Sequence, residues 1–94
     1  MNVTELRRAL RALEIPDREL ALGGQAEYSW CVEPSTDGLW EVYWYERGNK
    51  NGLARLSTES EACYYLLGRL TYSRLLGGTL AVREADNSPF TPEV

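Results

Sequence analysis

The residues that could do chemistry in this chain are carboxylates, cysteines and tyrosines, because it contains no histidine. Without an imidazole, neither a Ser-His-Asp nor a Cys-His arrangement can form within the chain. The two cysteines, Cys31 and Cys63, lack CxxC spacing and would need further ligands to hold a structural zinc. We therefore expect no metal site and no cofactor. The cysteines are expected to be reduced core residues, although the sequence alone leaves a disulfide open.

Paired carboxylates could still act as general acid and base, and the candidates are Glu41, Glu46, Glu59 and Glu61. That role requires a carboxyl pKa raised by desolvation, whereas these residues have the spacing of a solvated strand face or a helix start. The glycines fit neither the GxGxxG pattern nor the GxxxxGKS/T pattern, so no nucleotide-binding loop is expected. The sequence therefore predicts a protein that is not an enzyme.

The middle of the chain is acidic. The net charge is −4, and between positions 14 and 46 only Arg18 opposes Glu14, Asp17, Glu19, Glu27, Glu33, Asp37, Glu41 and Glu46. Such a segment repels nucleic acid and speeds association with basic partners, an effect that weakens as salt is added. The alternative is that these are ordinary solubilising charges.

Length and aromatic content indicate one domain with a central core. A chain of 94 residues is too short for two independent domains. All Trp and Tyr residues lie between Tyr28 and Tyr72, which predicts the core there. No run approaches the roughly 18 apolar residues of a membrane span, and no secretion signal is visible. We expect a cytoplasmic protein that contacts neither membrane nor nucleic acid directly.

The spacing of apolar residues predicts the elements. A helix capped by Thr4 should end at Pro16, residues 18–24 could be a turn or a short edge strand, and a helix capped by Thr58 and Glu61 should end at Gly77. Strands are expected over 28–33, 39–46 and 53–56, with a hairpin loop at 34–38 and a turn at 48–52. Within that turn Asn51-Gly52 is the pair that most readily supplies positive φ angles. Residues 79–82 could add a strand. The predicted fold is a two-layer α+β domain over residues 1–84, with an N-terminal helix, a three-stranded antiparallel meander and a C-terminal helix. Residues 85–94 are expected to form a flexible tail.

Alternation along 39–46 separates two faces of the expected sheet. Trp40, Val42 and Trp44 should face the helices, and Glu41, Tyr43 and Tyr45 should face outward. Tyrosine and arginine are favoured at interfaces because they combine a large contact area with a polar tip. The candidate partner-binding residues are Glu33, Asp37, Glu41, Tyr43, Tyr45, Glu46 and Arg47. The alternative is that a second helix or the 79–82 segment covers Tyr43 and Tyr45.

Two stretches carry a resemblance to a known family. Residues 40–48 read WEVYWYERG and residues 56–67 read LSTESEACYYLL, after an N-terminal segment, 6–16, that reads LRRALRALEIP. Over roughly positions 4–76 the chain resembles small immunity proteins of bacterial polymorphic-toxin and contact-dependent growth inhibition systems. It departs from their pattern at Trp44, where a second Tyr is usual, and by an extra residue pair near the helix start.

The resemblance implies a protein that binds one cognate toxin domain, often a nuclease with a basic substrate cleft, and blocks its active site or substrate groove. An acidic inhibitor would associate quickly with such a cleft. The competing hypotheses are a general protein-interaction or regulatory module and a homo-oligomeric structural protein. The sequence favours a monomer.

Overall fold

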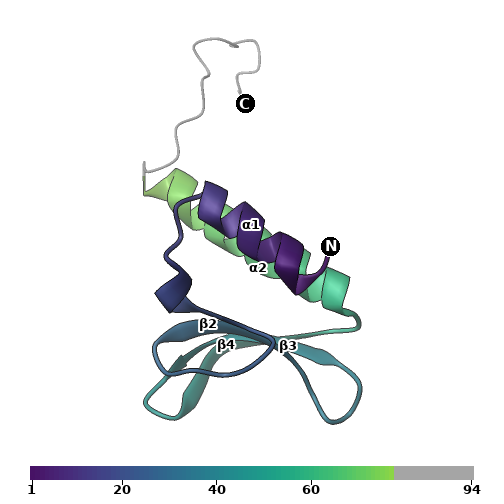
Figure 1. The fold of residues 1–94 in the computed structure, drawn as a ribbon. Helices are drawn as coiled ribbons and strands as arrows, with labels where there is room; N and C mark the ends of the chain where they lie inside the picture. Colours follow the sequence, from purple (N-terminus) through teal and green to yellow (C-terminus); the bar gives the residue numbers. More distant parts are fainter. Residues whose placement is uncertain (78–94) are drawn as a thin grey trace.

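A computed structural model describes residues 1–77 of the chain, which form a layer of two helices on a layer of β-sheet (Figure 1). Its elements are α1 (Val3–Ala12), a 3₁₀ turn η1 (Asp17–Glu19), β1 (Leu20–Leu22), β2 (Ser29–Pro34), β3 (Trp40–Glu46), β4 (Asn49–Leu56) and α2 (Glu59–Leu76). The predicted α+β class, with a helix before and a helix after the strands, is confirmed. The expected strand over 79–82 and the expected tail over 85–94 lie outside the described residues.

The sheet is mixed rather than purely antiparallel. Its four strands follow the order β1-β2-β3-β4, with antiparallel pairing of β2 with β3 and of β3 with β4. The three-strand meander is thus present, but β1 adds a fourth strand parallel to β2, in register from Leu20 opposite Trp30 to Leu22 opposite Val32. Both readings of residues 18–24 hold, because η1 leads directly into this short edge strand.

Helix α1 is capped at both ends by local hydrogen bonds. Asn2, not Thr4, is the N-cap, since its side chain accepts from the Glu5 amide while the Glu5 carboxylate accepts from the Asn2 amide. At the other end Glu14 has a left-handed φ of 63°, which directs the Ile15 amide back to the Leu10 carbonyl at 2.9 Å. The chain therefore turns off the helix before Pro16 and buries Ile15 beside Leu10.

Helix α2 begins where the sequence predicts. The Thr58 side chain accepts from the Glu61 amide, and the Glu61 carboxylate reaches the Ser57 amide rather than that of Thr58. The helix ends at Leu76, with Gly77 as its C-cap. Its side toward the sheet carries Ala62, Cys63, Leu66 and Leu70, all buried.

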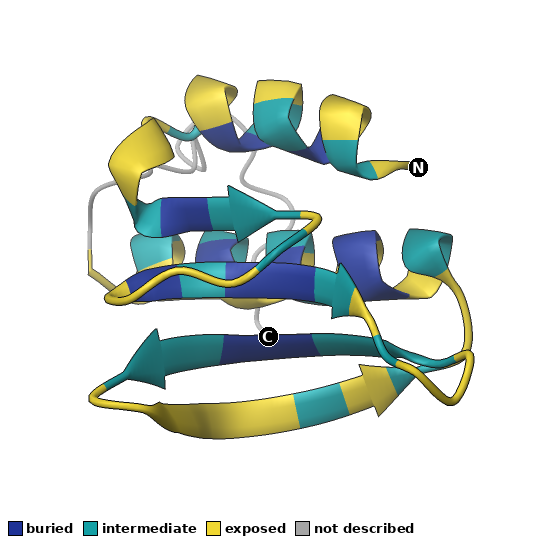
Figure 2. Cartoon of the chain, turned by 60° about the horizontal axis from the view of Figure 1, so that its bottom comes forward, coloured by how far each residue is buried: buried dark blue, intermediate teal, exposed yellow. Residues whose placement is uncertain are grey.

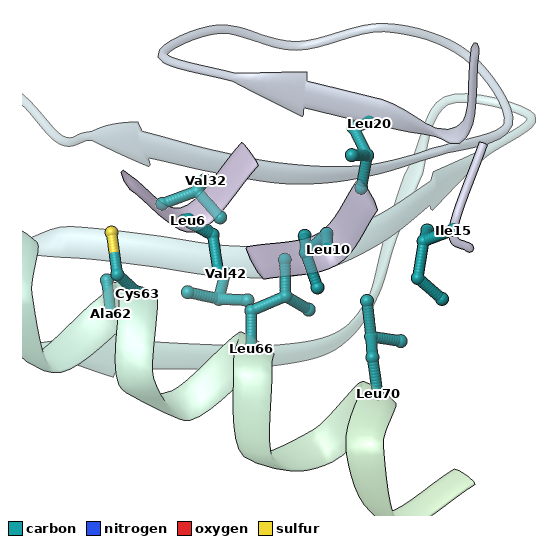
Figure 3. Packing of buried hydrophobic residues seen from close by; sticks show 10 residues of the cluster. All are labelled: Leu6, Leu10, Ile15, Leu20, Val32, Val42, Ala62, Cys63, Leu66 and Leu70. Atoms are coloured by element: carbon teal, nitrogen blue, oxygen red, sulfur yellow. The ribbon is translucent and has the colours of Figure 1, made fainter. Parts of the chain in front are cut away.

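The core lies between the helices and the even-numbered residues of β2 and β3 (Figure 3). Leu6 and Leu10 of α1 and Leu66 of α2 are fully buried there against Val32 and Val42. Removing one of these leucine side chains would cost about 2–5 kcal/mol. The full cluster is Leu6, Leu10, Ile15, Leu20, Val32, Val42, Ala62, Cys63, Leu66 and Leu70. Cys63 belongs to this core and Cys31 is buried on the opposite face of the sheet, and both are free thiols.

The second hairpin turns earlier than the sequence suggests. The turn is Arg47-Gly48, with φ values of 54° and 78°, and Glu46 pairs with Asn49 across it. Positive φ at both central residues is the two-residue turn that matches strand twist. The expected turn at Asn51-Gly52 is wrong, because Gly52 uses its φ of 64° in an irregularity within β4 opposite the Val42–Trp44 segment. As a result β4 runs from Asn49 rather than from Leu53.

Candidate functional site

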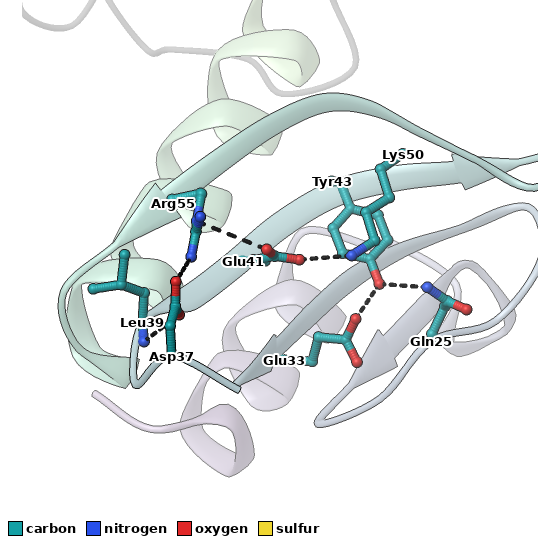
Figure 4. Close-up of polar contacts among 8 residues, drawn as sticks. All are labelled: Gln25, Glu33, Asp37, Leu39, Glu41, Tyr43, Lys50 and Arg55. Carbon is teal, nitrogen blue, oxygen red and sulfur yellow. Dashed lines mark hydrogen bonds and ion pairs between the residues drawn. The ribbon is translucent and has the colours of Figure 1, made fainter. Parts of the chain in front are cut away.

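The sheet has one face that the helices do not cover, and we call its residues the open face. Strand register places the odd-numbered residues of β2 and β3 there, beside two cations of β4. The open face comprises Ser29, Cys31, Glu33, Glu41, Tyr43, Tyr45, Lys50 and Arg55, with Asp37 at its edge in the β2–β3 loop. Figure 4 shows its charged residues and Tyr43. Five of the seven predicted partner-binding residues therefore gather on one surface: Glu33, Asp37, Glu41, Tyr43 and Tyr45.

A row of alternating charges crosses this face from the β2–β3 loop to β4. Arg55 donates to the Asp37 carboxylate and also lies with its Nε 3.7 Å from Glu41 Oε2. On the other side of Glu41, Lys50 Nζ donates to Oε1 at 2.7 Å. The Glu41 side chain is only 12% exposed, so its two oxygens are largely occupied by these two cations. The row is thus a connected network, which fixes the orientation of each member.

The ion pairs shift the titration of their members in the expected directions. The hydrogen bond from Arg55 lowers the pKa of Asp37, with help from the Leu39 amide. The hydrogen bond to Glu41 raises the pKa of Lys50. Both shifts favour the charged forms, so neither Asp37 nor Lys50 is prepared to give or take a proton near neutral pH.

Tyr43 is fully buried even though it lies on the open face, which corrects the expectation that it is exposed. The connection from β1 to β2, residues 23–28, crosses this side of β2 (Figure 2) and packs over the tyrosine. Gln25 Nε2 donates to the Tyr43 hydroxyl at 3.0 Å, and the hydroxyl donates to the Glu33 carboxylate. From the other side Lys50 Nζ lies 4.9 Å from the centroid of the Tyr43 ring.

The alternative of a covered tyrosine holds for Tyr43 only in part, because neither segment expected to cover it, a second helix or residues 79–82, is the one observed there, and 79–82 lies outside the described residues. The covering segment is the 23–28 connection rather than a helix. Burial, followed by the neighbouring Glu33 carboxylate, raises the pKa of Tyr43. Burial also raises the pKa of Cys31, whose thiol donates toward the Ala26 carbonyl of the same connection at 3.7 Å. Both groups are protonated at neutral pH, so neither is an activated nucleophile.

The remaining predicted residues lie at one end of the sheet. Tyr45 is half-buried and contacts the edge of the Tyr43 ring, with 6.1 Å between centroids. Glu46 lies on the helix-facing side, where its carboxylate accepts from Trp44 Nε1 at 2.8 Å. Arg47 forms the hairpin turn with its side chain exposed, and its amide donates to the Glu27 carboxylate. Glu46 is therefore not part of the open face.

Three residues of this site were missed by sequence reasoning. Lys50 and Arg55 belong to β4, which the sequence started three residues after Lys50, and Gln25 belongs to a connection for which no position was predicted. Lys50 and Arg55 could have been found from their charge, since cations on a strand paired with β3 are favoured opposite its carboxylates. No signal in the sequence identifies Gln25.

Within residues 1–77, no three His, Cys, Asp or Glu side chains come close enough to hold a metal ion, and no helix there is long and apolar enough to cross a membrane. The site is therefore a polar surface of carboxylates, cations and tyrosine. Comparisons of the chain with protein-family models, with curated proteins and with solved structures each gave no match.

Proposed function

We propose that this chain is an immunity protein that binds one cognate toxin domain through the open face and blocks the toxin's active site or substrate groove. The observation that carries the proposal is the gathering of Glu33, Asp37 and Glu41 on that face from two strands and a loop. The resemblance of residues 40–48 and 56–67 to immunity proteins supports the choice of partner. No catalytic role is assigned to any residue.

The charge row suits recognition of a basic cleft because its ion pairs can be exchanged. Asp37 and Arg55 are 50% and 42% exposed, and a solvent-exposed ion pair of this kind contributes little to stability. A lysine or arginine of the partner can therefore replace Arg55 on Asp37 at small cost. The network holds these carboxylates in place beforehand, which lowers the entropy lost on binding.

Glu33 is the one carboxylate of the three that forms no ion pair with another of residues 1–77. Its oxygen accepts from Tyr43, and none of the cations of residues 1–77 lies within ion-pair distance of it. On the open face it lies opposite Glu41 of β3, without a cation of its own among residues 1–77. Glu27 adds an exposed carboxylate at the other end of β2, where it accepts from the Arg47 amide.

One observation favours the alternative, a general protein-interaction module unrelated to toxins. Lys50 and Arg55 neutralise much of the charge of Glu41 and Asp37, so the open face is less acidic than the sequence of residues 14–46 suggests. A surface of mixed charge selects a partner of complementary pattern rather than any basic cleft. The two hypotheses share the surface and differ in the partner.

Co-purification with the product of the gene immediately upstream tests the proposal. A stable complex is expected, in which amide hydrogen exchange slows in β3 and β4 and stays unchanged at the start of α1. A complex that protects the helices and leaves both strands unchanged would contradict the open face as the binding surface. A gene locus without a toxin-like neighbour, together with no complex, would favour the general module.

A further inference from the structure

Helix α2 carries apolar residues on the side that faces away from the core. Tyr64 is 58% exposed, Tyr72 is 64% exposed and Leu75 is 38% exposed. These three residues and Gly68 follow one another at intervals of four, four and three, so they share one face of the helix. We call this set the α2 stripe. It lies opposite the buried side formed by Ala62, Cys63, Leu66 and Leu70.

The α2 stripe is more apolar than a solvated helix face. A helix at the surface of a small domain normally opposes its core side with charged residues. Between Ala62 and Ser73, the only charged residue of α2 is Arg69, which turns toward the sheet, with its guanidinium 5.3 Å from the centroid of the Trp30 ring. The stripe itself carries no charge. Two exposed tyrosines, a leucine and a glycine in line are typical of a helix that packs against another element.

Gly68 lies at the middle of the stripe and has no side chain, so the helix backbone is accessible there. Glycine inside a helix weakens it relative to alanine, so its presence asks for a packing reason. Inside this chain no such reason exists among the described residues, because a Cβ built on Gly68 would meet nothing within 4 Å. The glycine therefore serves no contact of residues 1–77 and leaves room for a close approach from outside.

The spacing about Gly68 is symmetric. Tyr64 precedes it by four residues and Tyr72 follows it by four. If a second copy of α2 crosses antiparallel at Gly68, a two-fold axis through the glycine sets Tyr64 of each copy against Tyr72 of the other. Such a contact is self-complementary, as a two-fold interface requires.

The charges at the ends of α2 favour the same arrangement. Its first turn carries Glu61, three residues before Tyr64, and its last turn carries Arg74, whose guanidinium also donates to the Glu14 carbonyl. In an antiparallel pair each acidic first turn lies near the basic last turn of the other helix, and the opposed helix dipoles also attract. A parallel pair would set like charges together. We propose that a second copy of this chain covers the α2 stripe, through an antiparallel α2–α2 contact that crosses at Gly68.

This inference does not depend on the proposed function, because the stripe and the open face lie on opposite layers of the molecule (Figure 1). It changes the expected stoichiometry of a complex. A dimer joined through α2 exposes two open faces pointing away from each other, so it would bind two partners.

Sedimentation of the isolated full-length chain over a concentration series tests the proposal. The wild-type chain is expected to form a dimer in a concentration-dependent way. Tyr64→Ser and Tyr72→Ser should each weaken self-association by about tenfold or more. Tyr28→Ser is the matched control, since Tyr28 is 53% exposed but lies outside α2, and it should leave self-association unchanged.

Gly68→Leu separates the proposed contact from a general loss of folding. A leucine has room in the single chain and is a better helix former, so the thermal midpoint of the monomer should not fall. It should nevertheless weaken the dimer, because the side chain would hold the two helices apart. A wild-type chain that stays monomeric at its highest soluble concentration would overturn the proposal. So would a dimer that forms equally well with Gly68→Leu.

Discussion

Lys50 donates to Glu41 across the β3–β4 pair, with 2.7 Å between Nζ and Oε1. The two residues are nine positions apart in the chain and belong to segments of different composition, one acidic and one basic. Their contact turns an acidic stretch of sequence into a surface of mixed charge. The proposed function therefore depends on the pattern of charge on the open face rather than on its sum.

Glu41 and Glu46 provide a direct test of which face binds. Both were candidate contacts, but β3 sends Glu41 to the open face and Glu46 to the helix-facing side. Glu41→Gln should slow association with the partner by about threefold or more at low salt, whereas Glu46→Gln removes the same charge and should change it little. Stopped-flow association at several salt concentrations measures both. Equal effects of the two substitutions would contradict the assignment of the face.

Tyr43 should make stability depend on alkaline pH. Its pKa is raised in the folded chain by burial and by Glu33, so the tyrosine contributes stability that is fully present below the unfolded pKa of about 10 and is lost as pH rises toward the folded value. Tyr43→Phe should cost about 1 kcal/mol at pH 7, for the hydrogen bond to Glu33, and should lose less stability than the wild type above pH 10.

Urea unfolding between pH 7 and 11 checks this prediction. Tyr28→Phe, which changes an exposed tyrosine, is the control and should follow the wild type at every pH. Cys63 contributes in the same direction, since burial raises the pKa of its thiol to about 11. If Tyr43→Phe and the wild type lose stability in parallel above pH 10, the tyrosine is not buried as described.

Arg47 adopts a backbone conformation that an arginine disfavours. Its φ of 54° is left-handed, a conformation that costs a residue with a Cβ about 1–2 kcal/mol and costs asparagine less. Arg47→Asn creates an Asn-Gly turn and should raise the free energy of unfolding by about 0.5–1 kcal/mol. Arg47→Val should lower it, because a β-branched residue tolerates this φ poorly. If Arg47→Asn also weakens partner binding while stabilising the fold, the arginine is retained for contact.

The start of α1 distinguishes two capping residues that the sequence offers side by side. Asn2→Ala should lower the free energy of unfolding by about 1 kcal/mol, because it removes the acceptor for the Glu5 amide. Thr4→Ala should change it by no more than about 0.5 kcal/mol, since Thr4 is an exposed helical residue. Thermal unfolding of both variants is sufficient. A larger loss from Thr4→Ala would restore the cap that the sequence suggested.

Asn2 and Thr4 also show how well a helix start can be predicted from the sequence. Thr4 was preferred for its place before the apolar positions of the helix, yet Glu5 stands three residues after Asn2, the spacing that a reciprocal cap needs. The sequence thus contains the correct capping pair, Asn2 with Glu5, beside the position of Thr4 that favours a later start. By contrast Thr58 has Glu61 three residues later whereas the neighbouring Ser57 has Ser60 there, and α2 begins where expected.

Alternation placed β2 and β3 correctly because a strand with one buried face has a period that the sequence displays. Alternation cannot identify β1, because its three residues are too few to show a period. Its partner β2 begins seven residues after β1 ends and pairs with it in parallel. The Asn51-Gly52 turn failed because a positive φ serves a bulge as well as a turn, and only the pairing of Glu46 with Asn49 decides between them.

The sequence predicts which residues of β3 share the open face, but not which of them are buried or paired with a cation. Period-two alternation put Glu41, Tyr43 and Tyr45 together, but burial of Tyr43 depends on Gln25 in an irregular connection, and neutralisation of Glu41 depends on the register of β4. Side-chain period is a local property, whereas cover and charge pairing are set by segments distant in sequence.

The most direct test of the account is a growth experiment in which the product of the gene immediately upstream is expressed with and without this chain. We expect the upstream product alone to stop growth, the wild-type chain to restore it, and Glu41→Gln to restore it less well than Glu46→Gln. An upstream product that is harmless, or a toxicity that the wild-type chain does not relieve, would contradict the proposed function.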